Sequence, residues 1–361
     1  MKRTGVLLIN LGTPDGPSPE AVGRFLREFL MDGYVLDIPA PLRWPLVNVA
    51  IVPRRRKQSA QLYQKIQSAD GPPLLFHTRQ LASEVSAELS ASEDPYLVTF
   101  GMRYGNPSIA SALEELSAED VEQILVLPLY PQYAESSFET AVVETRKRAA
   151  ELRCADKLFF LPPFYADPNF IKACVQRVRD HFNGDNPEHV VFSFHGVPVR
   201  HLKKLDQSQQ HCFVKQSCCQ EITDVNQNCY RAQCLYTAQA IRQQLGLSES
   251  SCTTSFQSRF GRTEWVGPAT DEVLRNLARS GVRKVAVFCP SFVADCLETL
   301  EEIAIRGSET FLDAGGEELR LIPSLNTHPV WVTTVSNWII EAAGGPRQRH
   351  SGAESFNRHR R

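Results

Sequence analysis

The sequence predicts an α/β protein built from two doubly wound units, each with a four-stranded parallel sheet flanked by helices. Its 361 residues are more than one ordinary hydrophobic core accommodates, so we expect two domains. Short apolar runs rich in β-branched residues alternate with helical patterns, which is typical of a parallel sheet covered on both faces. The alternation occurs twice, so the expected domains span residues 1–162 and 163–325.

The first half contains four apolar runs that are expected to form strands, at residues 4–10, 96–100, 121–129 and 158–161. Helices are expected between them, at residues 18–31, 58–69, 78–89, 107–116 and 137–152. The first of these helices should begin with Ser18 as its N-cap and Pro19 at its first helical position, because both residue types favour those places.

The second half repeats this order. Strands are expected at residues 190–194, 252–256 and 284–289, and helices at 167–182, 230–245, 268–279 and 295–305. A last helix over 328–343 is expected to complete the first domain. Residues 344–361 form a basic tail that we expect to be disordered.

The composition excludes some classes of function. The formal net charge of −2 gives no overall field for binding nucleic acid. No signal peptide precedes the first strand, and the ten cysteines then indicate a reducing, cytoplasmic compartment. The longest apolar region, 35–52, is a poor transmembrane helix because Asp37, Arg43 and three prolines interrupt it. This region suits either a packed surface loop or a contact with a flat apolar ligand or a membrane.

Strand 190–194 ends at His195, and Gly196 and Pro198 then break the strand. Ligands of parallel sheets bind beyond the carboxyl ends of the strands, where a histidine can move protons near neutral pH. A packed core histidine is the alternative for a residue taken alone. The other predicted strand ends that could face the same cleft are Asn10, Arg103, Tyr130, Ser258 and Phe292.

A second candidate group follows the strand that ends at residue 289. Asp295, Glu298 and Glu302 are spaced i, i+3 and i+7, which predicts one shared helix face. Acids in a first helical turn complement the helix dipole, and this alone explains Asp295 and Glu298 but not Glu302. A row of carboxylates leading from a cleft could guide a divalent cation or carry protons.

These motifs together resemble those of the ferrochelatases. The resemblance covers about residues 4 to 340, and its six motifs occur in the family's order, at 10–14, 101–104, 129–133, 193–198, 256–268 and 292–300. It implies two Rossmann-like domains of the class II chelatase type. It also implies a lyase that inserts Fe²⁺ into protoporphyrin IX, which is the last step of haem biosynthesis.

The resemblance assigns roles to the two candidate groups. His195 would accept a pyrrole proton, and Glu298 would face it across the macrocycle, so that both would meet the substrate Fe²⁺. Asp295 and Glu302 would stand behind Glu298. Metallation removes two protons from the ring, which requires a largely neutral imidazole or a carboxylate as the base. The side on which the metal enters stays open.

The resemblance also implies the porphyrin contacts. Arg54, Arg55 and Tyr63 match positions beside the pocket, and Arg103 and Ser258 are candidates for the propionates. The aromatic residues that could line the ring, with ordinary core packing as the alternative for each, are Tyr104, Tyr130, Trp265 and Phe292. Residues 35–56 match the apolar lip over the pocket mouth, which allows a peripheral membrane contact.

Five cysteines lie in an insertion over residues 203–234, namely Cys212, Cys218, Cys219, Cys229 and Cys234. Animal ferrochelatases hold a [2Fe–2S] cluster with one upstream cysteine and three near the C-terminus. Here Glu135 occupies the upstream place and no cysteine follows Cys296, so that cluster cannot form. The insertion instead resembles that of bacterial relatives with internal cluster cysteines.

That resemblance implies a [2Fe–2S] cluster on Cys212, Cys229, Cys234 and either Cys218 or Cys219. Tetrahedral zinc and free thiols are the alternatives. A chelatase for coproporphyrin III or cobalt, and a haem- or porphyrin-binding carrier that senses redox state, are the alternative functions. The oligomeric state does not follow from the sequence.

Overall fold

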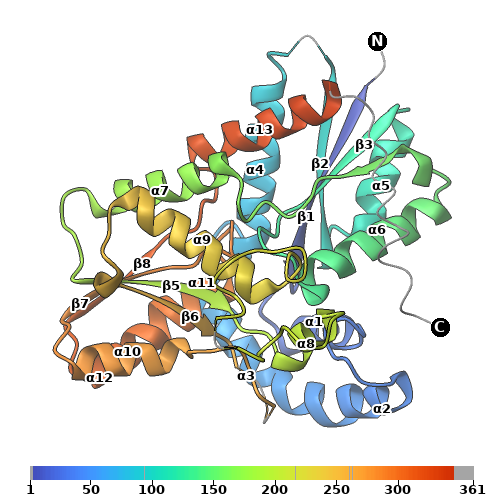
Figure 1. The fold of residues 1–361 in the computed structure, drawn as a ribbon. Helices are drawn as coiled ribbons and strands as arrows, with labels where there is room; N and C mark the ends of the chain where they lie inside the picture. Colours follow the sequence, from blue (N-terminus) through green and yellow to red (C-terminus); the bar gives the residue numbers. More distant parts are fainter. Residues whose placement is uncertain (1–2, 93, 216, 260, 262, 345–361) are drawn as a thin grey trace.

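The computed structural model describes residues 3–344 except 93, 216, 260 and 262. It contains two four-stranded sheets in which all strands are parallel, with strand orders β2-β1-β3-β4 and β6-β5-β7-β8 (Figure 1). The strands are β1 (Thr4–Thr13), β2 (Tyr96–Gly105), β3 (Gln123–Pro128), β4 (Leu158–Phe160), β5 (His189–His195), β6 (Cys252–Gln257), β7 (Lys284–Phe288) and β8 (Glu318–Ile322). The predicted fold class is therefore confirmed.

Strand β8 carries no prediction from the sequence. It lies at the edge of the second sheet beside β7, and four of its five residues are only half-buried. Its sequence, Glu-Leu-Arg-Leu-Ile, therefore lacks the continuous apolar run of the central strands.

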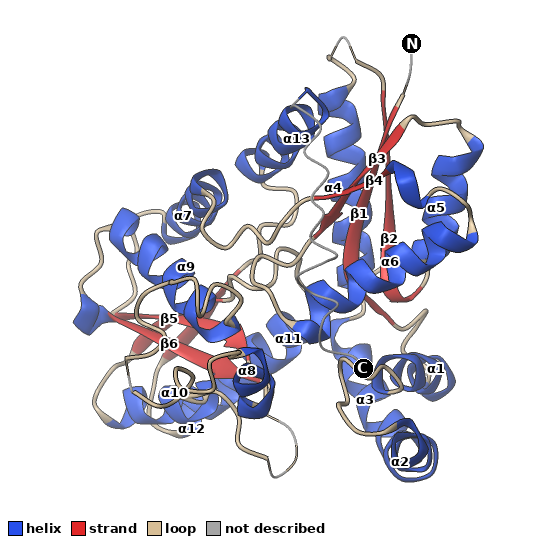
Figure 2. Cartoon of the chain, turned by 45° about the vertical axis from the view of Figure 1, so that its right-hand side comes forward, coloured by secondary structure: helices blue, strands red, loops and turns tan. Residues whose placement is uncertain are grey.

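Helices cover both faces of each sheet (Figure 2). The first half holds α1 (Pro19–Leu30), α2 (Ala40–Pro45), the π-helix η1 (Leu46–Ile51), α3 (Val52–Ile66), α4 (Pro73–Leu89), α5 (Ile109–Ala118), the π-helix η2 (Glu135–Glu139), α6 (Thr140–Glu151) and the 3₁₀ turn η3 (Ala155–Lys157). The second half holds α7 (Pro168–Phe182), α8 (Val199–Leu205), α9 (Tyr230–Leu245), the 3₁₀ turn η4 (Glu249–Ser251), α10 (Thr270–Arg279), α11 (Leu297–Thr299), the π-helix η5 (Leu300–Gly307), α12 (Ser308–Asp313) and α13 (Pro329–Gly344).

Two predicted helix starts are confirmed by their caps. The Ser18 side chain accepts the Ala21 N–H at the start of α1, and Pro19 is the first residue of that helix. Asp167 accepts the N–H groups of Asn169 and Phe170 at the start of α7. Each cap satisfies donors that the first helical turn leaves unpaired.

The lip, residues 35–56, is mostly helical rather than a loop. Helix α2, η1 and α3 follow one another without a break from Ala40 to Ile66. Pro41 lies in the first turn of α2, at the start of the whole segment, where a missing N–H costs nothing. Pro45 and Pro53 lie where α2 meets η1 and where η1 meets α3. The prolines therefore divide the segment without preventing helix formation.

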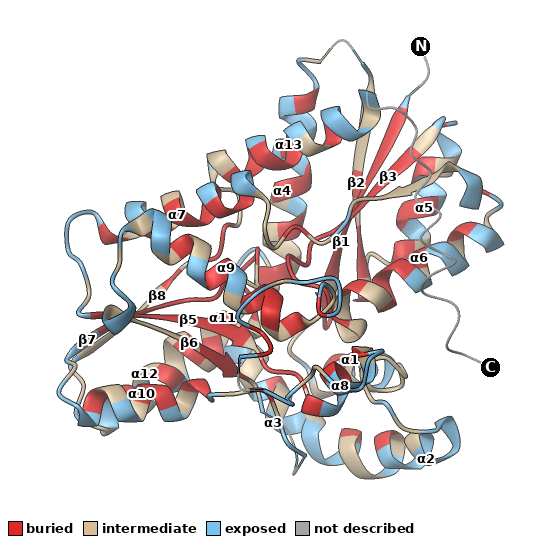
Figure 3. Cartoon of the chain, viewed as in Figure 1, coloured by how far each residue is buried: buried red, intermediate tan, exposed pale blue. Residues whose placement is uncertain are grey.

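The two halves share one hydrophobic core. Val6 and Leu8 of β1 belong to the same buried cluster as Phe192 and Phe194 of β5, and Trp331 of α13 lies fully buried within it. Buried stretches run along the central strands of both sheets (Figure 3). Helix α13 packs against α4 of the first half and α7 of the second. The last helix therefore joins the two sheets through apolar contacts.

Among the described residues, no helix has both the length and the apolar character needed to cross a membrane. The predicted disordered tail lies outside the described residues from 345 onwards.

Candidate active site

The carboxyl ends of strands from both sheets open on one cleft of about 1150 Å³. Residues 10–13 at the end of β1, 129–132 after β3, 195–198 at the end of β5 and 256–259 at the end of β6 all line it. Nine sequence-predicted site residues line this cleft, namely Arg55, Tyr63, Tyr130, His195, Ser258, Trp265, Phe292, Glu298 and Glu302. Arg54, Arg103, Tyr104 and Asp295 do not line it.

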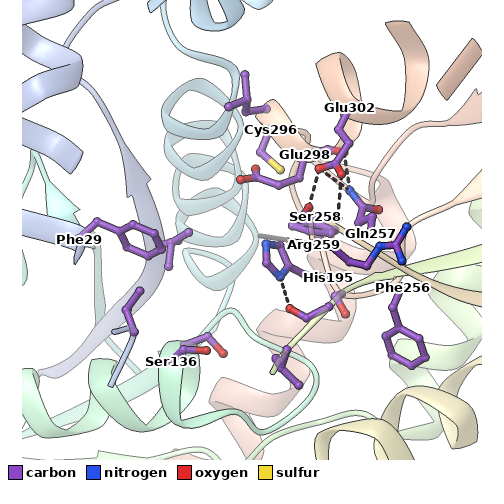
Figure 4. A pocket seen from close by; sticks show the side chains of 18 of the residues that line it. Phe29, Ser136, His195, Phe256, Gln257, Ser258, Arg259, Cys296, Glu298 and Glu302 are labelled. Atoms are coloured by element: carbon purple, nitrogen blue, oxygen red, sulfur yellow. Dashed lines mark hydrogen bonds between the residues drawn. The ribbon is translucent and has the colours of Figure 1, made fainter. Parts of the chain in front are cut away.

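His195 ends the central strand β5, and its ring enters the cleft (Figure 4). Its Nδ1 lies 2.6 Å from the carbonyl oxygen of Gly196. A carbonyl oxygen only accepts hydrogen bonds, so in the neutral ring Nδ1 carries the proton and Nε2 presents its lone pair. Gly196 cannot be replaced freely, because a Cβ there would lie 2.8 Å from the Gln257 carbonyl oxygen.

Glu298 enters the same cleft from α11, and its side chain lies between Cys296 and the neighbouring α3. Burial, together with the Glu298 charge, raises the pKa of the Tyr63 hydroxyl and of the Cys296 thiol. Both groups therefore stay protonated and neutral near pH 7. His195 and Glu298 thus reach one space from two separate elements (Figure 4).

Glu302, in the π-helix η5, has both carboxylate oxygens occupied. The Ser258 N–H donates to one oxygen at 2.8 Å, and the Ser258 hydroxyl donates to the other at 2.5 Å. The Gln257 amide also approaches the second oxygen at 3.4 Å. Ser258 itself has a φ of +67°, a left-handed conformation that a non-glycine residue adopts only when its surroundings hold it there.

The predicted row of three acids on one helix face is wrong at Asp295. The helix begins at Leu297, after an extended Cys296, so Asp295 precedes it. Asp295 is 5% exposed and accepts hydrogen bonds from the Ser324 N–H and the side chains of Thr299 and Asn326. These partners belong to α11 and to the loop between β8 and α13, and the carboxylate points away from the cleft.

The predicted propionate contact through Arg103 is not supported by its surroundings. Its guanidinium lies 2.5 Å from an Asp32 carboxylate oxygen and also donates to Thr140. The hydroxyls of Tyr104 and Thr140 donate to the same Asp32 oxygen. This group joins β2 and α6 to the loop after α1. Because that loop leads into the lip, Arg103 and Tyr104 stabilise the position of the lip.

The two predicted arginines of α3 separate. Both are exposed, but Arg54 donates to the Ala50 carbonyl, whereas Arg55 lines the cleft, where partial burial lowers the pKa of its guanidinium. Two further residues carry no prediction from the sequence, namely Gln257 in the cleft and Asp32 beside the lip. A polar residue at the end of a buried strand is a usable signal for Gln257, whereas Asp32 follows an ordinary helix end and carries no such signal.

The cysteine insertion brings four of its five thiols together. The Cys219 sulfur lies 3.5 Å from that of Cys218 and 3.9 Å from that of Cys229. Cys212 is the fourth thiol of the group: burial, together with the neighbouring Cys218 and Cys219, raises the pKa of the Cys212 thiol to about 11. Cys234 is fully buried, and its thiol interacts with Tyr230 and Ser291.

Asp206 anchors the start of this insertion. Its carboxylate accepts the backbone N–H groups of Ser208, His211 and Cys212, which lower its pKa well below the usual range. Within the described part of the chain, however, no group of three or more His, Cys, Asp or Glu side chains is arranged to hold a metal ion.

Known proteins resemble the chain over almost its whole length. The family model described as Ferrochelatase matches residues 3–343. A Ferrochelatase of Coxiella burnetii is 44% identical over 336 residues, which cover 92% of each chain. A Ferrochelatase of Azotobacter vinelandii is 45% identical over 332 residues, which cover 92% of this chain and 96% of that relative.

Among solved structures, SirB from Bacillus subtilis with Fe³⁺ matches with a TM-score of 0.52 at 13% identity, covering 99% of this chain and 98% of SirB. That likeness concerns the fold alone. The family model and the two bacterial relatives match the sequence of the chain over nearly its whole length. The chain therefore belongs to the ferrochelatases, the lyases that insert iron into a porphyrin in haem biosynthesis.

Proposed function

We propose that the chain inserts Fe²⁺ into protoporphyrin IX, with His195 as the proton acceptor and Glu298 on the opposite side of the macrocycle. The observation that carries this proposal is the shared cleft, which His195 enters from β5 and Glu298 from α11. A volume of about 1150 Å³ suits a large planar ligand, and its walls are mostly apolar.

The hydrogen bond between His195 Nδ1 and the Gly196 carbonyl fixes the tautomer that the reaction needs. Nε2 is then the free base that accepts a pyrrole proton, and the Gly196 carbonyl stabilises the imidazolium that forms. Glu298 offers a carboxylate that accepts the second proton. With one pyrrole proton on His195 and the other on Glu298, both protons released by insertion are accounted for.

The cleft lining favours a porphyrin with few carboxylates. Five of the lip residues that line it are aliphatic, namely Val35, Leu36, Ile38, Leu46 and Ile51, and Arg55 adds one cation. Protoporphyrin IX carries two propionates and two vinyl groups, whereas coproporphyrin III carries four propionates. An aliphatic wall therefore suits protoporphyrin, and Arg55 is the proposed partner of a propionate. The hydroxyl of Ser258, the other predicted partner, donates to Glu302 instead.

We also propose a [2Fe–2S] cluster in the cysteine insertion, on four of Cys212, Cys218, Cys219, Cys229 and Cys234. Two thiolates on one tetrahedral metal with bonds of about 2.3 Å lie about 3.8 Å apart, and the Cys219 and Cys229 sulfurs, at 3.9 Å, fit this spacing. This favours Cys219 over Cys218. The cluster would serve structure or sensing of iron and redox state, because insertion itself involves no redox change.

A cytoplasmic location with peripheral membrane contact is the proposed setting. Leu42, Trp44 and Val49 of the lip are 64%, 58% and 66% exposed, and Leu46 lines the cleft from the same segment. Exposed apolar side chains at the mouth of an apolar cleft suit the delivery of an apolar substrate from a lipid surface.

Anaerobic turnover separates the enzyme from a porphyrin carrier. The wild-type protein should convert protoporphyrin IX and Fe²⁺ to haem faster than it metallates coproporphyrin III or inserts cobalt. Glu298→Gln should lower kcat at least 100-fold, while Glu317→Gln, an exposed carboxylate outside the cleft, is the matched control. Tight porphyrin binding without turnover would favour the carrier, and a fully active Glu298→Gln would refute the role of Glu298.

A further inference from the structure

Gln257, the last residue of β6, contacts both the strand that carries His195 and the backbone of Glu298. We propose that Gln257 is a positioning residue that fixes the separation between His195 and Glu298. This inference rests on the proposed roles of those two residues. Gln257 is 3% exposed and lines the cleft beside them, next to Glu302 (Figure 4).

The backbone of Gln257 holds the His195 side. Residues 195 and 257 are register partners in the parallel pair of β5 and β6. The Gly196 N–H donates to the Gln257 carbonyl oxygen at 2.7 Å, while the Gly196 carbonyl accepts the His195 ring at 2.6 Å. The peptide unit that orients the imidazole is therefore itself fixed to Gln257.

The side chain of Gln257 holds the Glu298 side. Its Nε2 donates to the backbone carbonyl oxygen of Glu298 at 2.7 Å. Its Oε1 accepts the hydroxyl of the fully buried Ser193 at 2.7 Å. This orientation of the amide is the only one that satisfies its partners, because the Glu298 carbonyl can only accept and therefore must face the NH₂ group.

Glu302 and Ser258 complete this arrangement. Both Glu302 oxygens accept hydrogen bonds from Ser258, and this interaction holds Ser258 at its positive φ directly after Gln257. Glu302 therefore fixes the position of Ser258, and both Glu302 and Glu298 line the cleft.

A displacement of about 1 Å between reacting groups can cost about 100-fold in rate. Gln257→Met keeps the length of the side chain but removes the donor to Glu298 and the acceptor for Ser193. It should lower kcat by about 10- to 100-fold, while the KM for the porphyrin changes less than threefold. Gln123→Met is the control, since Gln123 lies at the opposite end of β3 and donates to Thr4; it should leave kcat unchanged.

Gln257→Glu distinguishes positioning from a general structural role. A protonated carboxyl can donate to the Glu298 carbonyl, whereas an ionised one repels it. The introduced carboxyl would face Glu302, the Glu298 carboxylate and the Cys289 thiol, and burial beside these groups raises its pKa. The kcat of this variant should approach the wild-type value at low pH and fall as pH rises, at pH values where wild-type kcat is constant.

A Gln257→Met enzyme with unchanged kcat would overturn the inference. A wild-type protein without turnover, or an active His195→Ala enzyme, would instead overturn the proposed function. A crystal structure of Gln257→Met should show a changed distance between His195 and Glu298, and an unchanged distance would also overturn the inference.

Discussion

The Asp32→Ala substitution tests whether Arg103 supports the lip rather than the substrate. Asp32 follows α1 and accepts three side-chain hydrogen bonds on one oxygen, from Arg103, Tyr104 and Thr140. Its other oxygen accepts the Tyr34 N–H at 2.8 Å. The substitution leaves a guanidinium that is 13% exposed and a fully buried tyrosine hydroxyl without their acceptor.

The expected cost follows from this burial. Breaking a buried ion pair on one side destabilises a protein by about 3–5 kcal/mol, because the remaining charge is left without a partner. The Asp32 side chain is 8% exposed, so water can reach part of the site after the substitution. We therefore expect a loss at the lower end, about 3 kcal/mol.

Urea denaturation of wild type, Asp32→Ala, Arg103→Met and the double variant measures this cost and the coupling between the two residues. The double variant should be about as stable as either single variant, because the second substitution removes the unpaired partner. Glu119→Ala is the control, since its ion pair with Arg3 at 2.9 Å is about half exposed and should contribute less than about 1 kcal/mol. A loss below about 0.5 kcal/mol for Asp32→Ala would refute the reasoning.

Three further predictions follow from other parts of the molecule. Burial lowers the pKa of His189 below its ordinary value of 6.5, so below that pH the unfolded state binds more protons than the folded state. The free energy of unfolding should therefore fall as pH decreases through 6.5. In urea titrations at pH 5.5 to 7.5, His189→Gln should flatten this dependence. Cys219→Ser and Cys229→Ser should each abolish visible absorption and labile sulfide in freshly purified protein, whereas Cys154→Ser, in the core of the first half, should retain both; retention in all three would contradict the cluster. Trp44→Glu should reduce co-sedimentation with anionic lipid vesicles at least fivefold, and equal sedimentation with wild type would exclude lip contact.

The fold could be predicted because the central strands are buried on both faces. β1 and β5 are continuous apolar runs, so their length and position are visible in the sequence. The edge strand β8 is half exposed and lacks that signal. The helices of the lip are harder to predict, because prolines usually interrupt a helix. Here the prolines lie near the boundaries between helical segments, where helices tolerate them, and the composition of the segment does not reveal this.

The candidate site could be predicted where function depends on strand ends. His195, Ser258 and Phe292 follow strands, and parallel topology alone brings such residues to one edge. Arg103 also lies towards the end of a strand, but the position of Asp32 determines its partner, and that contact spans 71 residues of sequence. The prediction that Asp295 shares a helix face with the other two acids is wrong because the helix begins two residues later, at Leu297. Partners set by tertiary contacts leave no periodic signal in the chain.

The most direct test of the central claim is the anaerobic metallation of protoporphyrin IX by Fe²⁺ with wild-type protein and His195→Ala. Porphyrin fluorescence should report binding to both proteins with dissociation constants within threefold of each other. Because general-base catalysis contributes about 10²- to 10⁴-fold, kcat for His195→Ala should fall at least 100-fold. Equal kcat for the two proteins would contradict the assignment of His195 as the proton acceptor.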